Sequence, residues 1–156
     1  MTHGSLSLWH QSLVDSGEDA LAPRRGLDGD TETDVCVVGA GYTGLWTAYY
    51  LLATDPSLRV IVVEAEIAGF GASGRNGGWC SALFPSSVAS LTRRHGRERA
   101  LAMRRAMNDC VEEVGRVTAA EGIDCHFLRG GTVSLARTAV QLRRARLAAA
   151  DDAAFD

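Results

Sequence analysis

Hydrophobic residues are concentrated in two short runs that enclose a longer apolar segment. The first run, Val35 to Val38, has valine at three of its four positions, and the second, Arg59 to Val63, is also rich in β-branched residues. Between them, residues 45–52 form an apolar segment of helical length. The order strand, helix, strand predicts a βαβ unit with a parallel sheet, and we expect the first strand to be buried.

Glycines with G-x-G-x-x-G spacing follow the first run, at Gly39, Gly41 and Gly44. The first permits a tight turn, the second lets a pyrophosphate approach the backbone, and the third lets the helix pack close to the sheet. A helix that starts near Tyr42 directs its free N–H groups and its dipole at that pyrophosphate. Glu64 follows Gly44 by 20 residues, which is where an acidic residue accepts hydrogen bonds from a ribose. The spacing predicts a dinucleotide site.

A second glycine-rich segment occupies residues 65–80 and does not resemble a simple connector. Five glycines fall between Gly69 and Gly78, with three polar side chains among them: Ser73, Arg75 and Asn76. Successive main-chain N–H groups in such a loop form concavities that bind anions, and a guanidinium matches phosphate geometry. The segment therefore predicts a second loop that contacts the cofactor.

The remaining segments suggest three parts with boundaries after residues 33 and 121. Residues 1–33 form a mostly polar leader with a helical turn near Leu6 to Leu13, which is either a lid or interface arm or a poorly ordered tail. Residues 34–121 contain the βαβ unit, the second loop and a helix over 86–121 that ends at Gly122.

Residues 122–156 are predicted to hold a β-hairpin over 123–136 and a helix from Thr138 onward. His126 lies within the hairpin, and a structural or exposed role is expected for it. Only two parallel strands can be found, whereas a doubly wound sheet has five or six. The fold class is therefore α/β with an incomplete Rossmann-like domain, and the sequence is interpreted as the N-terminal part of a longer protein.

Charge and cysteine content narrow the functional classes. Among 156 residues the formal net charge is −3, all 16 basic residues are arginine, and acids are interspersed with them, so no nucleic-acid partner is expected. No apolar run reaches the length that spans a bilayer, and the N-terminus lacks a secretory signal, so a cytoplasmic location is expected. The four cysteines have no C-x-x-C spacing, so neither a disulfide nor a metal site is predicted.

The two glycine loops resemble those of the FAD-dependent amine and amino-acid oxidases of the D-amino-acid oxidase superfamily. Residues 34–45 are similar to that family's ADP-binding fingerprint, and Gly69 to Gly78 resembles the flavin-contacting loop of its gamma-glutamylputrescine-oxidase-like branch. The resemblance implies a glutathione-reductase-type FAD domain followed by the start of a mixed substrate domain. It also implies oxidation of a C–N bond to an imine, with hydride transfer to FAD, on an amine or amino-acid substrate.

The resemblance also implies roles for individual residues. The FAD pyrophosphate contacts would come from the first loop: Gly39, Gly41, Tyr42, Thr43 and Gly44. The adenosine ribose would be held by Glu64. Contacts to the phosphates or the ribityl region would come from Ser73 and Arg75. The residues near the isoalloxazine ring would be Asn76, Gly77, Gly78 and Trp79. No catalytic residue can be named, and the family's substrate-binding part is not found in the sequence.

Two alternatives stay open from the residues alone. One is the NAD-binding domain of a dehydrogenase, because Glu64 suits the ribose of NAD as well as that of FAD. The other is an inactive truncated or split-protein fragment that needs a partner chain or a missing C-terminal half, because an incomplete sheet leaves an open edge.

Overall fold

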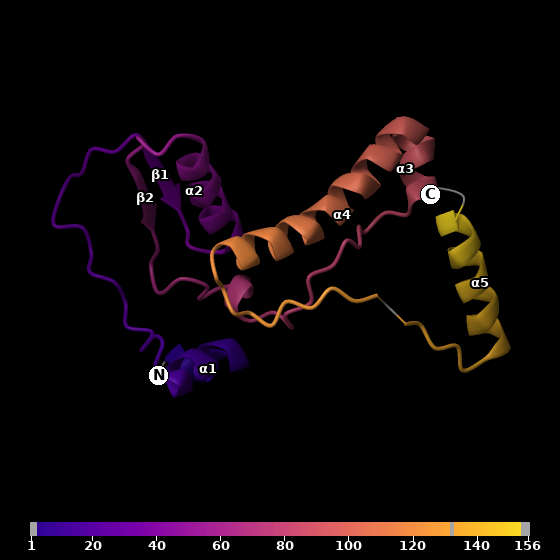
Figure 1. Ribbon diagram of the computed structural model, residues 1–156, viewed down its shortest axis with the longest axis horizontal. Helices are drawn as coiled ribbons and strands as arrows, with labels where there is room; N and C mark the ends of the chain where they lie inside the picture. Colours follow the sequence, from indigo (N-terminus) through magenta and orange to yellow (C-terminus); the bar gives the residue numbers. More distant parts are fainter. Residues whose placement is uncertain (1–2, 132, 154–156) are drawn as a thin grey trace. The chain divides into compact units, whose positions relative to one another are not determined.

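The computed structural model describes residues 3–131 and 133–153, which divide into two units, Met1–Trp79 and Cys80–Asp156 (Figure 1). Both glycine-rich loops belong to the first unit up to Trp79. The helix predicted over 86–121 belongs to the second unit, whereas the sequence analysis placed it in one part, residues 34–121, with the two glycine loops. The three-part division with boundaries after residues 33 and 121 stays a prediction.

The first unit contains the predicted βαβ arrangement. Strand β1 (Val35–Val38) is followed by helix α2 (Tyr42–Thr54) and strand β2 (Val60–Val63). The strands pair in parallel, with Val35 opposite Val60 and Val38 opposite Val63. Helix α2 contacts both strands (Figure 1). The prediction of a parallel α/β unit is confirmed, and β2 begins one residue later than expected.

The burial predicted for β1 is wrong on one of its two faces. Side chains alternate along the strand, so that Val35 and Val37 are partly buried while Cys36 and Val38 are exposed. Val38 keeps 85% of its surface exposed. The physical reason is that α2 covers one face of a two-stranded sheet, and within the described residues no element covers the other.

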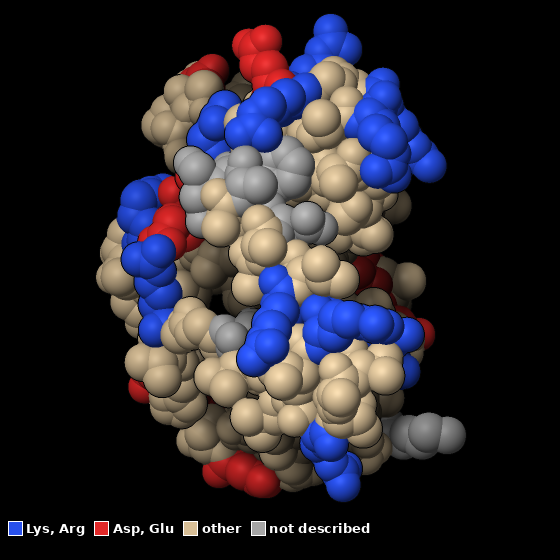
Figure 2. Space-filling view, turned by 90° about the vertical axis from the view of Figure 1, so that its right-hand side faces the viewer, with Lys and Arg blue, Asp and Glu red and all other residues tan. Residues whose placement is uncertain are grey.

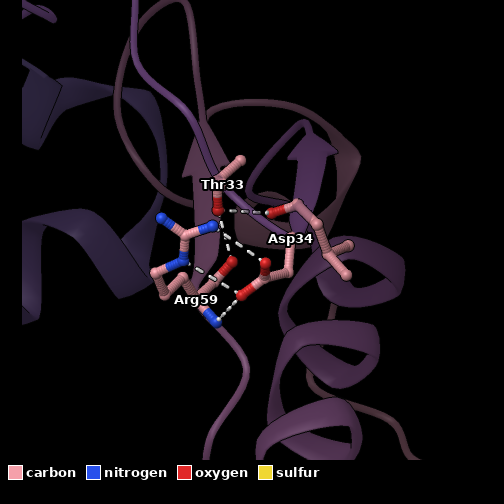
Figure 3. A network of polar contacts seen from close by, with 4 residues as sticks. Thr33, Asp34 and Arg59 are labelled. Carbon is pink, nitrogen blue, oxygen red and sulfur yellow. Dashed lines mark hydrogen bonds and ion pairs between the residues drawn. The ribbon is translucent and has the colours of Figure 1, made fainter.

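An ion pair joins the residues that directly precede the two strands (Figure 3). The Arg59 guanidinium donates to both Asp34 carboxylate oxygens, at 2.9 and 3.1 Å, and the Arg59 main-chain N–H donates to Asp34 Oδ2 at 2.8 Å. The Thr33 hydroxyl donates to the Arg59 carbonyl oxygen. The side-chain hydrogen bond from Arg59, followed by its main-chain bond, lowers the pKa of Asp34 from 3.8 to about 2. The contact therefore ties Asp34, just before β1, to Arg59, just before β2.

This contact predicts a pH dependence of stability. Because the folded pKa of Asp34 lies below its ordinary value, the ionised contact stabilises the fold above about pH 4 and is lost as the pH falls toward 2. We expect Asp34→Asn to lower the free energy of unfolding at pH 7 and to flatten its decrease between pH 4 and 2. Urea denaturation across this range measures both effects. Asp28→Asn, which removes a more exposed pair with Arg25, is the matched control, and equal behaviour of the two variants would contradict the prediction.

The leader contains a short helix, so the helical turn predicted near Leu6 to Leu13 is confirmed. The 3₁₀ turn η1 (His3–Leu6) precedes helix α1 (Leu8–Ser16), where the Ser7 hydroxyl accepts the His10 N–H at the N-terminus. Gly17 ends the helix with a φ of 75°. Residues 17–34 then reach β1 without helix or strand (Figure 1). A second 3₁₀ turn, η2 (Ala72–Gly74), lies in the second glycine loop.

The second unit contains helices α3 (Val88–His95), α4 (Arg97–Ala120) and α5 (Ala139–Ala153). The single helix predicted over 86–121 is therefore two helices. Gly96 interrupts it with a φ of 85° and a ψ of 157°, a conformation that glycine adopts without a Cβ penalty. The predicted end is confirmed, since α4 stops at Ala120 and Gly122 has a φ of 66°.

The predicted hairpin is not formed in residues 123–131 and 133–136, and Thr132 lies outside the described residues. Instead the chain after α4 folds back on that helix. A Cβ built at Gly115 would lie 2.5 Å from the Phe127 ring, and Arg129 pairs with Glu112 at 2.7 Å. Leu128, Val133 and Leu135 are 84–90% exposed. Strand pairing does not arise here because an isolated hairpin without a packed face is marginal in water.

Candidate functional site

The first glycine loop makes the tight turn that the sequence predicts. Gly39 has a φ of 100°, and its N–H donates to the Val63 carbonyl at 2.8 Å, so the turn continues the pairing with β2. The next N–H, of Ala40, donates to Glu64 Oε2 at 2.8 Å. The turn and the end of β2 are thus joined at the carboxyl ends of both strands, where ligands of open α/β sheets bind.

Gly44 and Gly41 meet different neighbours. A Cβ built at Gly44 would overlap the Gly39 carbonyl oxygen and lie 3.2 Å from Val37 Cγ1, so this glycine lets α2 pack against β1. A Cβ built at Gly41 would lie 3.0 Å from the Ser73 hydroxyl oxygen. Gly41 therefore permits close approach by a group on the second loop, and its own backbone is extended, with a φ of −87°.

The N-terminus of α2 presents main-chain donors. The Tyr42 N–H donates to the Ser73 hydroxyl at 2.9 Å. The N–H groups of Gly41, Thr43 and Gly44 have no protein acceptor among residues 3–131 and 133–153. Free N–H groups and the positive end of the helix dipole at one place form an anion site. These free N–H groups at the helix start were predicted from the glycine spacing, and their contact with a pyrophosphate stays a prediction.

Glu64 lies directly after β2 and is held by three main-chain donors. Its carboxylate accepts the N–H groups of Ala40 at 2.8 Å, Ala65 at 2.9 Å and Glu66 at 3.3 Å. The Ala40 bond, with smaller effects from Glu66 and Ala65, lowers the pKa of the Glu64 carboxyl. Glu64 is therefore an oriented, ionised hydrogen-bond acceptor at neutral pH, and its contact with a ribose stays a prediction.

The second loop folds back onto the first through Asn76. The Asn76 side-chain amide donates to the Tyr42 hydroxyl at 3.0 Å and to the Ser73 carbonyl at 2.6 Å, and its Oδ1 accepts the Gly78 N–H at 2.7 Å. Together with the Ser73 contact to the Tyr42 N–H, these bonds bring Ser73 and Asn76 to the N-terminus of α2. The sequence predicted both loops but not that they touch.

Arg75 lies on the same loop with its side chain directed at Phe70. Its Nε donates to the Phe70 carbonyl at 2.8 Å, and the guanidinium lies 4.8 Å from the centre of the Phe70 ring. Gly77 and Gly78 are exposed, and Trp79 keeps 70% of its surface exposed. Contact of these residues with a phosphate or a flavin stays a prediction.

Two leader residues that the sequence did not single out as site residues contact the second loop. The Trp9 Nε1–H donates to the Asn76 carbonyl at 2.7 Å, and the His10 ring packs against the backbone of Gly74. His10 is 3% exposed. The sequence around Trp9 gives little indication of this contact. Trp9 is an isolated apolar residue in a polar segment, and no neighbouring residue indicates which distant loop it contacts.

Other groups offer little chemistry. His126 is 91% exposed and lies 3.2 Å from Asp124, outside any strand of the described segment. Over 3–131 and 133–153 there is no cluster of three or more potential metal ligands. The helices in that part of the chain are too short or too polar to cross a bilayer. On the face in Figure 2, arginines stand beside acidic and uncharged side chains, and the absence of a nucleic-acid partner stays a prediction.

Comparison with known families agrees with this geometry. Residues 34–155 match the family described as DAO, FAD dependent oxidoreductase, which is more than half of the chain. The chain belongs to this family. The DAO family is FAD-dependent, so the resemblance derived from the two glycine loops is confirmed.

Two bacterial relatives extend the match. The chain is 36% identical over 120 residues to gamma-glutamylputrescine oxidoreductase of Escherichia coli K12, covering 77% of this chain and 28% of the relative. It is 31% identical to the probable oxidoreductase OrdL of Haemophilus influenzae, covering 62% of this chain and 22% of the relative. The chain thus spans about a quarter of the length of these relatives.

A third relative matches a shorter part of the chain. Thiamine thiazole synthase of Schizosaccharomyces pombe is 37% identical over 65 residues, which is 42% of this chain and 20% of the relative. No solved structure matches the chain significantly.

Proposed function

We propose that this DAO-family chain binds the ADP half and part of the flavin of FAD, in an enzyme that oxidises the C–N bond of an amine or amino acid. The observation that carries this proposal is the junction of the two loops, where Ser73 and Asn76 meet the N-terminus of α2. A dinucleotide site for NAD needs only the first loop and Glu64. A second loop fixed over the same helix end favours a larger, flavin-bearing cofactor.

The proposed roles follow the geometry of the first unit. The main-chain N–H groups at the start of α2 would hold the pyrophosphate, with close approach permitted at Gly41. Glu64 would accept hydrogen bonds from the adenosine ribose, since its carboxylate is ionised and oriented. The second-loop residues proposed for the phosphates, the ribityl chain and the ring are Ser73, Arg75, Asn76, Gly77, Gly78 and Trp79.

The chemistry of the proposed reaction resides in the cofactor. When bound, FAD would supply a hydride acceptor for the carbon that bears the nitrogen. The residues of this chain would bind and orient FAD, and no catalytic acid or base is assigned to them. The relative named gamma-glutamylputrescine oxidoreductase favours an amine substrate of that general class.

The substrate-binding groups are proposed to lie in further polypeptide, either a longer chain or a partner. Two features support this proposal. The outer face of β1 is uncovered within the described residues, with Val38 85% exposed. The chain also matches only 28% of the E. coli relative. An uncovered apolar sheet face is a site where more protein packs.

A cofactor titration tests the proposal. We expect the purified 156-residue chain to quench the fluorescence of added FAD in a saturable way and to gain thermal stability from FAD but not from NADH. ADP should compete, because it carries the half of FAD that the first loop holds. Equal stabilisation by NADH would favour the dehydrogenase alternative, and no response to FAD would contradict FAD binding by this chain.

A further inference from the structure

The leader helix α1 makes specific contacts with the second glycine loop, and these contacts suggest a function for the segment before β1. The Trp9 indole donates to the Asn76 carbonyl at 2.7 Å across 67 residues of sequence. Such a bond orders the loop only if the helix that carries Trp9 is itself in place. Ser7 caps α1 through the His10 N–H at 3.3 Å, and Gly17 closes its C-terminus.

Glycines of the second loop make room for these two leader side chains. A Cβ built at Gly78 would lie 2.8 Å from the Trp9 ring, and one built at Gly74 would lie 2.6 Å from His10 Cε1. Neither indole nor imidazole could therefore lie where it does if the loop carried ordinary residues. A Cβ at Gly74 would also overlap the Gly69 carbonyl oxygen, and Gly78 has a φ of 71°, so both glycines serve the loop's own backbone as well as the approach of α1.

The His10 side chain is fixed from both sides. It is 3% exposed, its Nδ1 lies 2.7 Å from the Ser7 hydroxyl, and its far edge meets the Gly74 backbone. Burying a polar ring costs free energy unless its nitrogens have hydrogen-bond partners. The bond to Ser7 therefore favours this one position of the His10 ring. His10 therefore anchors α1 against Gly74 of η2, the residue that follows Ser73.

The contacts continue from the leader to the helix end that faces the proposed pyrophosphate. Trp9 bonds to the Asn76 carbonyl, and the Asn76 side chain bonds to the Tyr42 hydroxyl and the Ser73 carbonyl. Ser73 in turn accepts the Tyr42 N–H. Movement of Trp9 would release the Asn76 backbone and, through it, both loop contacts with α2.

We infer that Trp9 and His10 are positioning residues for the cofactor site, which hold the Ser73–Gly78 segment against the N-terminus of α2. The inference rests on the proposed FAD site for its functional meaning. The structural part of the inference, that the leader orders the second loop, does not depend on any cofactor. The leader is thus a fixed part of the site and not a detached arm.

Hydrogen exchange in the cofactor-free 156-residue chain tests the structural content directly. We expect Trp9→Ala to speed exchange of the Gly78 and Tyr42 amides roughly tenfold, since their acceptors lie on the released segment. Trp9→Phe keeps the ring but removes the indole donor and should give a smaller increase. Leu8→Ala, one residue away with its side chain 73% exposed, is the control and should leave both amides unchanged.

Cofactor titration of the same variants tests the functional meaning. We expect Trp9→Ala to weaken FAD binding roughly tenfold and Trp9→Phe to weaken it less, with Leu8→Ala like the unaltered chain. Unchanged exchange in Trp9→Ala overturns the positioning role whatever happens to FAD. Failure of the unaltered chain to bind FAD overturns the proposed function and leaves the exchange result to decide the role of the leader.

Discussion

Gly44→Val should unfold much of the first unit. The added side chain would overlap the Gly39 carbonyl oxygen and crowd Val37 Cγ1 on β1. The carbonyl oxygen belongs to the main chain of the turn, so it cannot move away without breaking the turn. Overpacking of this kind costs about 3 kcal/mol, and more where the obstructing atom is backbone. We expect a loss of that size in the free energy of unfolding, measured by urea denaturation with circular dichroism.

Gly71→Val is the matched control for this substitution. Gly71 lies in the same unit, has a φ of −76°, and a Cβ built there meets nothing within 4 Å. The variant adds the same side chain to open space, so its stability should stay within about 0.5 kcal/mol of the unaltered chain. If the two variants lost the same stability, close packing of α2 on β1 at Gly44 would not be the cause.

Gly41→Val should remove FAD binding while leaving the fold in place. The Gly41 backbone is extended, with a φ of −87° and a ψ of −176°, so valine adopts it without strain. Its side chain, however, would begin 3.0 Å from the Ser73 hydroxyl, which accepts the Tyr42 N–H at the start of α2. We expect FAD affinity to fall by about 100-fold or more, which corresponds to roughly 2.7 kcal/mol.

Flavin fluorescence titration measures the loss, and far-UV circular dichroism shows that the helices remain. Gly26→Val serves as the control here, because Gly26 lies outside both glycine loops and a Cβ built there meets nothing within 4 Å. Undiminished FAD affinity in Gly41→Val would falsify the assignment of the pyrophosphate to this turn.

Local patterns predicted the βαβ unit well because each element is determined by neighbours in sequence. The valine runs form the strands, and the spacing of Gly39, Gly41 and Gly44 fixes the turn and the helix start. Glu64 follows from the same spacing. Its three main-chain donors were not foreseen, since they depend on how the chain bends after β2.

Features that depend on distant partners were predicted poorly. Burial of Cys36 and Val38 was inferred from their apolar character, but the outer face of a strand is buried only where another layer covers it. The hairpin over 123–136 failed for a related reason, because Phe127 packs at Gly115 of α4 and leaves no strand partner. Trp9 illustrates the same limit, since its partner Asn76 lies 67 residues away.

If FAD binds as proposed, the Ser73 hydroxyl would make its binding an exchange of hydrogen-bond acceptors at the N-terminus of α2. With its oxygen 2.9 Å from the Tyr42 nitrogen, it serves the helix as a neutral surrogate for an incoming anion. An arriving phosphate would replace one acceptor with a stronger, charged one, so the net gain at that donor is the difference between the two bonds. The same bond satisfies the Tyr42 N–H within the chain itself, so the second loop caps the N-terminus of α2.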